Sequence, residues 1–144
     1  KKEAINEHTA YLMVNLMKGV VQEGTGIRAR LLYVTESEMA GKTGTTNENA
    51  DGWFIGYLPK LTAGVWVGAE DRQVHFNTTA MGGGSNTALP IWGIFMKKVL
   101  EDGSLGVTKY DKFIPPQGFK LSLDCNGSDQ DMNNNSESQD SFFE

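Results

Sequence analysis

The feature that most constrains the fold of this chain is a pair of apolar segments separated by only two residues. The segments are residues 52–58 (GWFIGYL) and 61–68 (LTAGVWVG), and Pro59 and Lys60 lie between them. Both segments are rich in aromatic and β-branched residues, and so short a link predicts an antiparallel β-hairpin. Apolar side chains fall on both faces of the first segment. This predicts a central strand that is covered on both sides.

Two other segments have helical periodicity. Apolar side chains recur every three or four positions in residues 9–23, with Thr9 as the expected N-cap and Gly24 as the stop. A second helix is expected over residues 87–101, and a further strand over residues 38–46. The order helix, strand, strand, strand, helix predicts an α+β fold in which a partial antiparallel sheet is flanked by helices.

The composition limits the functional class. A net charge of −5 over 144 residues, without a Lys/Arg stripe, argues against nucleic-acid binding. Residues 120–144 are acidic and Asn/Ser-rich, which predicts a disordered tail after a folded portion at residues 1–119. The one cysteine, Cys125, lies in that tail, so we expect no disulfide, metal or other cofactor. No apolar run approaches the ~20 residues of a membrane helix, and residues 1–8 do not resemble a signal peptide.

The candidate functional motif is the stretch AGKTGTT at residues 40–46. A phosphate loop also ends in Gly-Lys-Thr, but it needs a glycine five residues before Gly41, where this chain has Glu36. The stretch ESEMAGKT would place two carboxylates where backbone amides must hold the phosphate, so we disfavour nucleotide binding. A triple glycine at residues 82–84 could form an anion-binding nest, but we favour a flexible link.

As a strand, this motif is suited to holding a peptide that ends in a carboxylate. Lys42 supplies positive charge, and the hydroxyls of Thr43 and Thr45 can donate hydrogen bonds to a carboxylate. Gly44 allows a ligand backbone to approach closely, and an edge strand can pair with an extended peptide. A backbone N–H at this position could also form half of an oxyanion hole.

The residues around the motif resemble the C-terminal part of the transpeptidase domain of class A penicillin-binding proteins, which are bifunctional peptidoglycan synthases. The resemblance covers residues 5–99, and its most specific parts are residues 42–46, 51–59, 65–68 and 88–96. Lys-Thr-Gly is itself one of the motifs of penicillin-binding proteins and class A β-lactamases. The resemblance implies the C-terminal portion of the penicillin-binding/serine β-lactamase-like fold.

The resemblance also implies a role for each motif residue. Lys42 is similar to the lysine that points into the family's active site and contacts the serine of its second motif. Thr43 and Thr45 resemble the hydroxyls that hold the carboxylate of the D-Ala-D-Ala stem peptide or of a β-lactam, and Gly44 keeps the strand open to substrate. The N–H of Thr45 resembles an oxyanion donor. The implied reaction is acyl transfer through a serine acyl-enzyme to an amine.

The serine nucleophile that the resemblance requires does not occur in this sequence. No serine is followed by a lysine at the third position after it, and the second family motif, Ser-x-Asn, is absent. We therefore expect the nucleophile, and the rest of the same domain, to lie N-terminal to Lys1 in a protein at the extracytoplasmic face of the cell membrane. The chain would then supply one wall of the site and be inactive alone. Self-association through an exposed sheet edge is a further hypothesis.

Two other functions remain open. One is a β-lactamase or carboxypeptidase relative that shares the strand motif, although the hairpin and the last helix argue against it. The other is a non-catalytic module that binds peptides along the strand edge, and it predicts affinity of the isolated chain for D-Ala-D-Ala peptides.

Several residues near the motif have two interpretations. Asp51 could orient the Lys-Thr-Gly strand or simply form a turn. Trp53, Trp66 and Trp92 have strand or helix spacing, so we expect them in the core or at an interface rather than stacked on sugars. Both histidines are expected at the surface.

Overall fold

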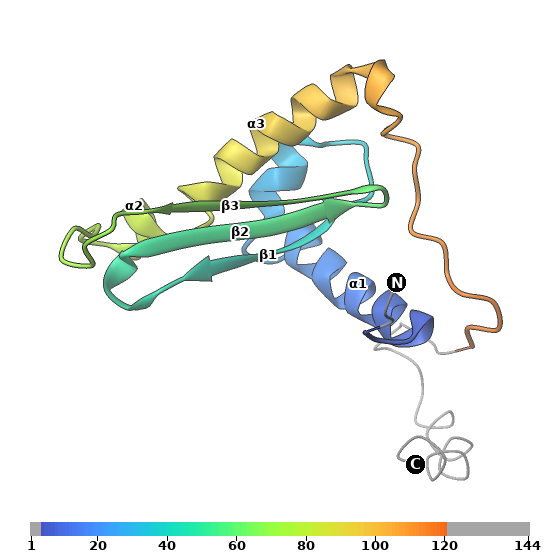
Figure 1. The fold of residues 1–144 in the computed structure, drawn as a ribbon, viewed down its shortest axis with the longest axis horizontal. Helices are drawn as coiled ribbons and strands as arrows, with labels where there is room; N and C mark the ends of the chain where they lie inside the picture. Colours follow the sequence, from blue (N-terminus) through green and yellow to red (C-terminus); the bar gives the residue numbers. More distant parts are fainter. Residues whose placement is uncertain (1–3, 121–144) are drawn as a thin grey trace, which may run out of the picture.

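The computed structural model describes residues 4–120, so the predicted acidic tail lies, apart from Lys120, outside the described residues. Its main elements are the helix α1, three strands, a four-residue helix and the helix α3 (Figure 1). Their bounds are α1 Glu7–Gln22, β1 Ala40–Thr45, β2 Asp51–Leu58, β3 Leu61–Gly68, α2 Thr79–Gly82 and α3 Ala88–Glu101. A five-residue π-helical turn, Ala29–Tyr33, follows α1, and short 3-10 turns occur at Asn47–Asn49 and Gly103–Leu105.

The three strands form one antiparallel sheet in the order β1-β2-β3. The predicted hairpin is confirmed, because β2 and β3 pair from Leu58↔Leu61 to Asp51↔Gly68. The α+β fold with an antiparallel sheet and flanking helices is confirmed as well, and β1 is an edge strand. The prediction of Thr9 as N-cap is wrong, because the side chain of Asn6 accepts a hydrogen bond from Thr9 N (2.8 Å) and starts α1 at Glu7.

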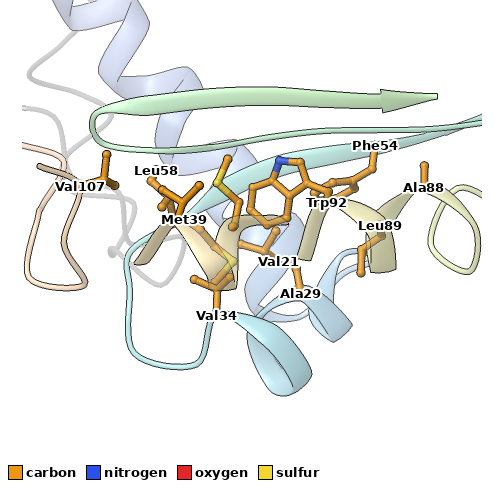
Figure 2. Close-up of a cluster of buried hydrophobic side chains, with 12 residues drawn as sticks. Val21, Ala29, Val34, Met39, Phe54, Leu58, Ala88, Leu89, Trp92 and Val107 are labelled. Carbon is orange, nitrogen blue, oxygen red and sulfur yellow. The ribbon is translucent and has the colours of Figure 1, made fainter. Parts of the chain in front are cut away.

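The core lies between one face of the sheet and the two long helices. Trp92 of α3 is completely buried and meets Phe54 of β2 edge to face, with ring centroids 5.0 Å apart (Figure 2). Its indole N–H donates to the carbonyls of Gly56 (3.2 Å) and Ala63 (3.1 Å), which ties α3 to both strands of the hairpin. A Cβ on Gly56 would lie 2.7 Å from the Trp92 ring, so this close approach requires glycine.

The prediction that β2 is covered on both sides is wrong for the described residues. Its side chains alternate between the two faces: Phe54 is fully buried, whereas Trp53 and Ile55 are 43% and 49% exposed. Trp66 of β3, which pairs with Trp53, is 46% exposed. The long helices both pack on the other face, as Figure 1 shows. We call the face that carries Lys42, Trp53, Ile55 and Trp66 the open face.

Residues 107–119 run back from the end of α3 to α1, along the orange segment of Figure 1. The ring of Phe113 meets Tyr57 at one end of the open face, and the backbone N–H of Phe113 donates to Glu38 (3.0 Å) just before β1. Asp111 forms an ion pair with Lys60 at the hairpin turn (2.6 Å). This segment therefore closes one end of the sheet.

Candidate active site

The predicted site residues lie together on the edge strand β1, but they divide between its two faces. Lys42 pairs with Ile55, Thr43 with Phe54 and Thr45 with Gly52. Because opposite residues of an antiparallel pair share a face, Lys42 lies on the open face. Thr43 and Thr45 lie on the face that the helices cover. A ligand along the strand edge would therefore meet a cation on one side and hydroxyls on the other.

The ammonium group of Lys42 is exposed and its charge is not neutralised by any carboxylate within residues 4–120. It donates a hydrogen bond to the carbonyl oxygen of its neighbour Thr43 (2.9 Å). Its neighbour across the sheet, Ile55, is apolar. Any protein surface that covered the open face would exclude water from this cation and strengthen its interaction with a negative charge.

The two threonine hydroxyls are each held by another segment. The hydroxyl oxygens of Thr43 and Thr25 are 2.7 Å apart, with Thr25 in the turn that follows α1. The hydroxyl oxygen of Thr45 accepts a hydrogen bond from the backbone N–H of Gly84 (3.1 Å). A hydroxyl has one proton to donate and can accept hydrogen bonds as well. The contact with Gly84 therefore leaves the Thr45 proton available for a ligand.

The backbone N–H of Thr45 points away from the sheet. Immediately after β1, Thr46 N donates to Asp51 O (3.1 Å), so these two residues form a hydrogen-bonded pair. Hydrogen-bonded and non-hydrogen-bonded pairs alternate along an antiparallel ladder. The next pair, Thr45 and Gly52, is therefore non-hydrogen-bonded, and the N–H of Thr45 faces the free edge of β1.

Asp51 holds the end of the motif strand to the rest of the sheet. Its carboxylate accepts hydrogen bonds from the hydroxyl of Thr46 (3.0 Å) and from the indole N–H of Trp66 (2.9 Å). Its own N–H donates to the hydroxyl of Thr46 (2.9 Å). Of the two interpretations given for Asp51, the one in which it orients the strand describes these contacts better.

Residues 82–84 are not the flexible link that the sequence predicted. All three glycines are buried, and a Cβ on Gly84 would lie 2.4 Å from Gly44 O and 2.3 Å from Trp53 O. The segment is therefore packed directly on the backbones of β1 and β2. A run of glycines in the sequence predicted freedom of the backbone, whereas here it permits close approach.

The remaining candidates lie as follows. Trp92 is in the core, as predicted, while Trp53 and Trp66 are half-exposed with ring centroids 6.4 Å apart on the open face. His8 and His75 are exposed, also as predicted. Within residues 4–120 there is no cluster of three or more His, Cys, Asp or Glu side chains that could hold a metal ion. Over the same residues, none of the helices has the length and apolar character needed to cross a membrane.

Comparison with known proteins identifies the family in which this strand occurs. The family model described as penicillin binding protein transpeptidase domain matches residues 1–96. Penicillin-binding protein 1A of Pseudomonas aeruginosa is 41% identical over 98 residues, which is 68% of this chain and 11% of that protein. Penicillin-binding protein 1A of Neisseria flavescens is 33% identical over 119 residues, or 83% of this chain and 14% of that protein.

A solved structure shows the same arrangement of elements. The crystal structure of penicillin-binding protein 1A from Haemophilus influenzae matches with a TM-score of 0.65 and 25% sequence identity. The match covers 78% of this chain and 17% of that chain. In each comparison the chain spans less than a fifth of the related protein's length.

Proposed function

This chain belongs to the penicillin-binding protein transpeptidase domain family, and we propose that it supplies the Lys-Thr-Gly strand of a peptidoglycan D,D-transpeptidase. That enzyme would cross-link stem peptides by acyl transfer and would be acylated by β-lactams. The observation that carries the proposal is the edge strand β1, where one cation, two hydroxyls and an outward-facing N–H lie within four residues.

We propose a role for each group in this reaction. Thr43 and Thr45 hold the carboxylate of the D-Ala-D-Ala peptide or of the β-lactam by hydrogen bonds. The N–H of Thr45 faces the free edge and stabilises the oxyanion of the tetrahedral intermediate. Lys42 provides positive charge on the open face and favours deprotonation of the attacking hydroxyl. Gly44 leaves the strand accessible to the substrate backbone.

The nucleophile comes from a segment outside these 144 residues, since no serine here has a lysine at the required spacing. Lys42 points to the open face, so we infer that this segment approaches from that side. The covering segment belongs to the same domain in a protein at the extracytoplasmic face of the membrane, where peptidoglycan is assembled. The chain alone is then one wall of the site and does not turn over substrate.

Labelling of the full-length protein that contains this chain by a fluorescent penicillin tests the proposal. We expect Lys42→Met to lower the second-order rate constant of labelling about 10²- to 10³-fold, a loss typical of one oxyanion-type stabilising group. Lys98→Met is the matched control, because Lys98 is an exposed lysine on α3, away from β1. Equal labelling of both variants would contradict the proposed role of the strand.

A second function is favoured by one observation, the free edge of β1. An extended peptide could pair with this edge as a fourth strand, and the chain would then bind the peptide without catalysing a reaction. Titration of the purified chain with a D-Ala-D-Ala peptide distinguishes the two functions. The transpeptidase proposal predicts no measurable binding, because the chain alone supplies only one side of the site. Light scattering of the same sample tests whether the edge instead pairs with a second copy of the chain.

A further inference from the structure

The two threonine hydroxyls of the motif are held by two segments that are far apart in the sequence. Thr25, in the turn after α1, contacts Thr43 with 2.7 Å between the hydroxyl oxygens. Gly84, in the glycine segment before α3, donates its N–H to the hydroxyl of Thr45 (3.1 Å). Each hydroxyl oxygen therefore has one neighbour that fixes its position, and neither neighbour belongs to the sheet.

The glycine segment, residues 82–84, is packed closely enough on the sheet to hold the Gly84 N–H in a fixed position. Gly84 lies so close to the backbones of Gly44 and Trp53 that no larger residue fits. The hydroxyl of Thr87 donates to Gly83 O (3.1 Å), and a Cβ on Gly52 would lie only 2.2 Å from that hydroxyl. These contacts fix the position of the Gly84 N–H relative to β1.

Arg28 links the two segments. Its guanidinium donates hydrogen bonds to the side-chain oxygen of Asn86 and to the carbonyl of Ser85 (3.4 Å), just after the glycine segment. Arg28 lies three residues after Thr25, in a turn fixed by the hydrogen bond from Gly26 N to Val20 O (2.9 Å). The contacts close a ring that runs from Thr43 through Thr25, Arg28, Asn86 and Gly84 to Thr45.

We propose that Arg28 is a positioning residue, which orients the hydroxyls of Thr43 and Thr45 toward a ligand carboxylate by tying the turn after α1 to the glycine segment. This inference rests on the proposed function of the strand. A donor that is already aligned loses little entropy when the ligand binds. Because Gly84 occupies one acceptor direction of the Thr45 hydroxyl, its proton is directed to another partner. Arg28 itself does not touch the substrate.

The test compares two acylating ligands on the full-length protein, a penicillin with a free carboxylate and its methyl ester. We expect Arg28→Ala to lower the acylation rate constant for the free acid about tenfold, the partial loss of one hydrogen bond to a charged group, and to leave that of the ester unchanged. Arg28→Lys should restore part of the loss, because one guanidinium nitrogen makes both contacts. Arg30→Ala is the control, since the only side-chain hydrogen bond of Arg30 within residues 4–120 goes to Gln22 O (3.4 Å).

An equal fall for acid and ester, or no change for either, would overturn the inference while leaving the proposed function intact. Failure of the unaltered protein to react with either ligand would instead contradict the proposed function. In that case hydrogen exchange decides the inference, because it needs no activity. Arg28→Ala should accelerate exchange at the Gly84 amide but not in β2. Unchanged exchange at Gly84 would contradict the inference that Arg28 holds this segment in place.

Discussion

The two faces of the sheet differ in what covers them, although their residues alternate along the same strands. On the helix-covered face, Phe54 is buried against Trp92 of α3, and Leu58 is buried in the same core cluster. On the open face, Trp53 and Ile55 are about half-exposed. Large apolar side chains in adjacent positions are thus buried on one side and left accessible on the other.

This difference separates the apolar core, which stabilises the fold, from the cation of the motif. The covered face contributes most of the apolar burial of the described chain, and such burial is the main stabilising term in folding. The open face carries the Lys42 cation within an apolar surround. We therefore expect substitutions of the buried apolar residues on the covered face to unfold the chain, and substitutions on the open face to affect activity first.

The largest effect should come from the contrast between Phe54 and its neighbour Ile55. Phe54→Ala should lower the free energy of unfolding of the purified chain by about 3–5 kcal/mol, because it leaves a cavity against Trp92. Ile55→Ala should lower it by about 1 kcal/mol, since that side chain is already half in water. Urea denaturation measures both, and similar losses would show that the open face is covered in solution.

The next largest effect comes from replacing tryptophan by phenylalanine at Trp92, which packs on the covered face, and at Trp66, which lies on the open face. Trp92→Phe should lower the free energy of unfolding by about 2–3 kcal/mol, because the indole N–H bonds to Gly56 O and Ala63 O are lost together with packing. Trp66→Phe should cost about 1 kcal/mol, the net value of its hydrogen bond to Asp51. A reversed order in thermal or urea denaturation would contradict the assignment of the two faces.

The smallest effect concerns the segment that closes one end of the open face. The side-chain hydrogen bond from Lys60, with a backbone hydrogen bond from Thr108, holds the pKa of Asp111 below its ordinary value. A carboxyl group whose pKa is lower in the folded state stabilises the fold above its unfolded pKa, and this contribution is lost as the pH falls through the folded pKa. In Asp111→Asn the free energy of unfolding should therefore fall less steeply as the pH decreases. The effect should be small, because the ion pair is exposed and screened by solvent.

Denaturation midpoints between pH 7 and pH 2 measure this effect, with Asp71→Asn as control. Within the described residues, the carboxylate of Asp71 accepts a hydrogen bond only from the nearby Gln73 N (2.9 Å). An identical acid profile for Asp111→Asn and the unaltered chain would show that the ion pair with Lys60 does not persist in solution.

Local patterns in the sequence predicted the elements and the hairpin, but not what covers them. The aromatic residues of β2 predicted a strand buried on both sides, because periodicity reports that a side chain is apolar and not whether another element reaches it. The same pattern on two faces thus has two outcomes, with Phe54 buried and Ile55 half-exposed.

The motif itself was recognisable, because its residues are contiguous from Lys42 to Thr45. The contacts that orient the motif were not recognisable. Thr25 and Gly84 reach β1, and Arg28 reaches Asn86, only through tertiary packing between segments far apart in the sequence. Nothing in the local sequence around Arg28 marks Asn86 as its partner. The requirement for glycine at position 84 also has no local signal, because it comes from the backbones of Gly44 and Trp53 beneath it.

Mapping the residue that penicillin acylates tests the central claim most directly. The full-length protein would be labelled, digested and analysed by mass spectrometry, beside the purified 144-residue chain treated in the same way. We predict one acylated serine in a segment outside this sequence, and no label on the chain alone. A penicilloyl group on any serine of the chain, such as Ser37 or Ser85, would contradict the account, because the chain would then hold its own nucleophile.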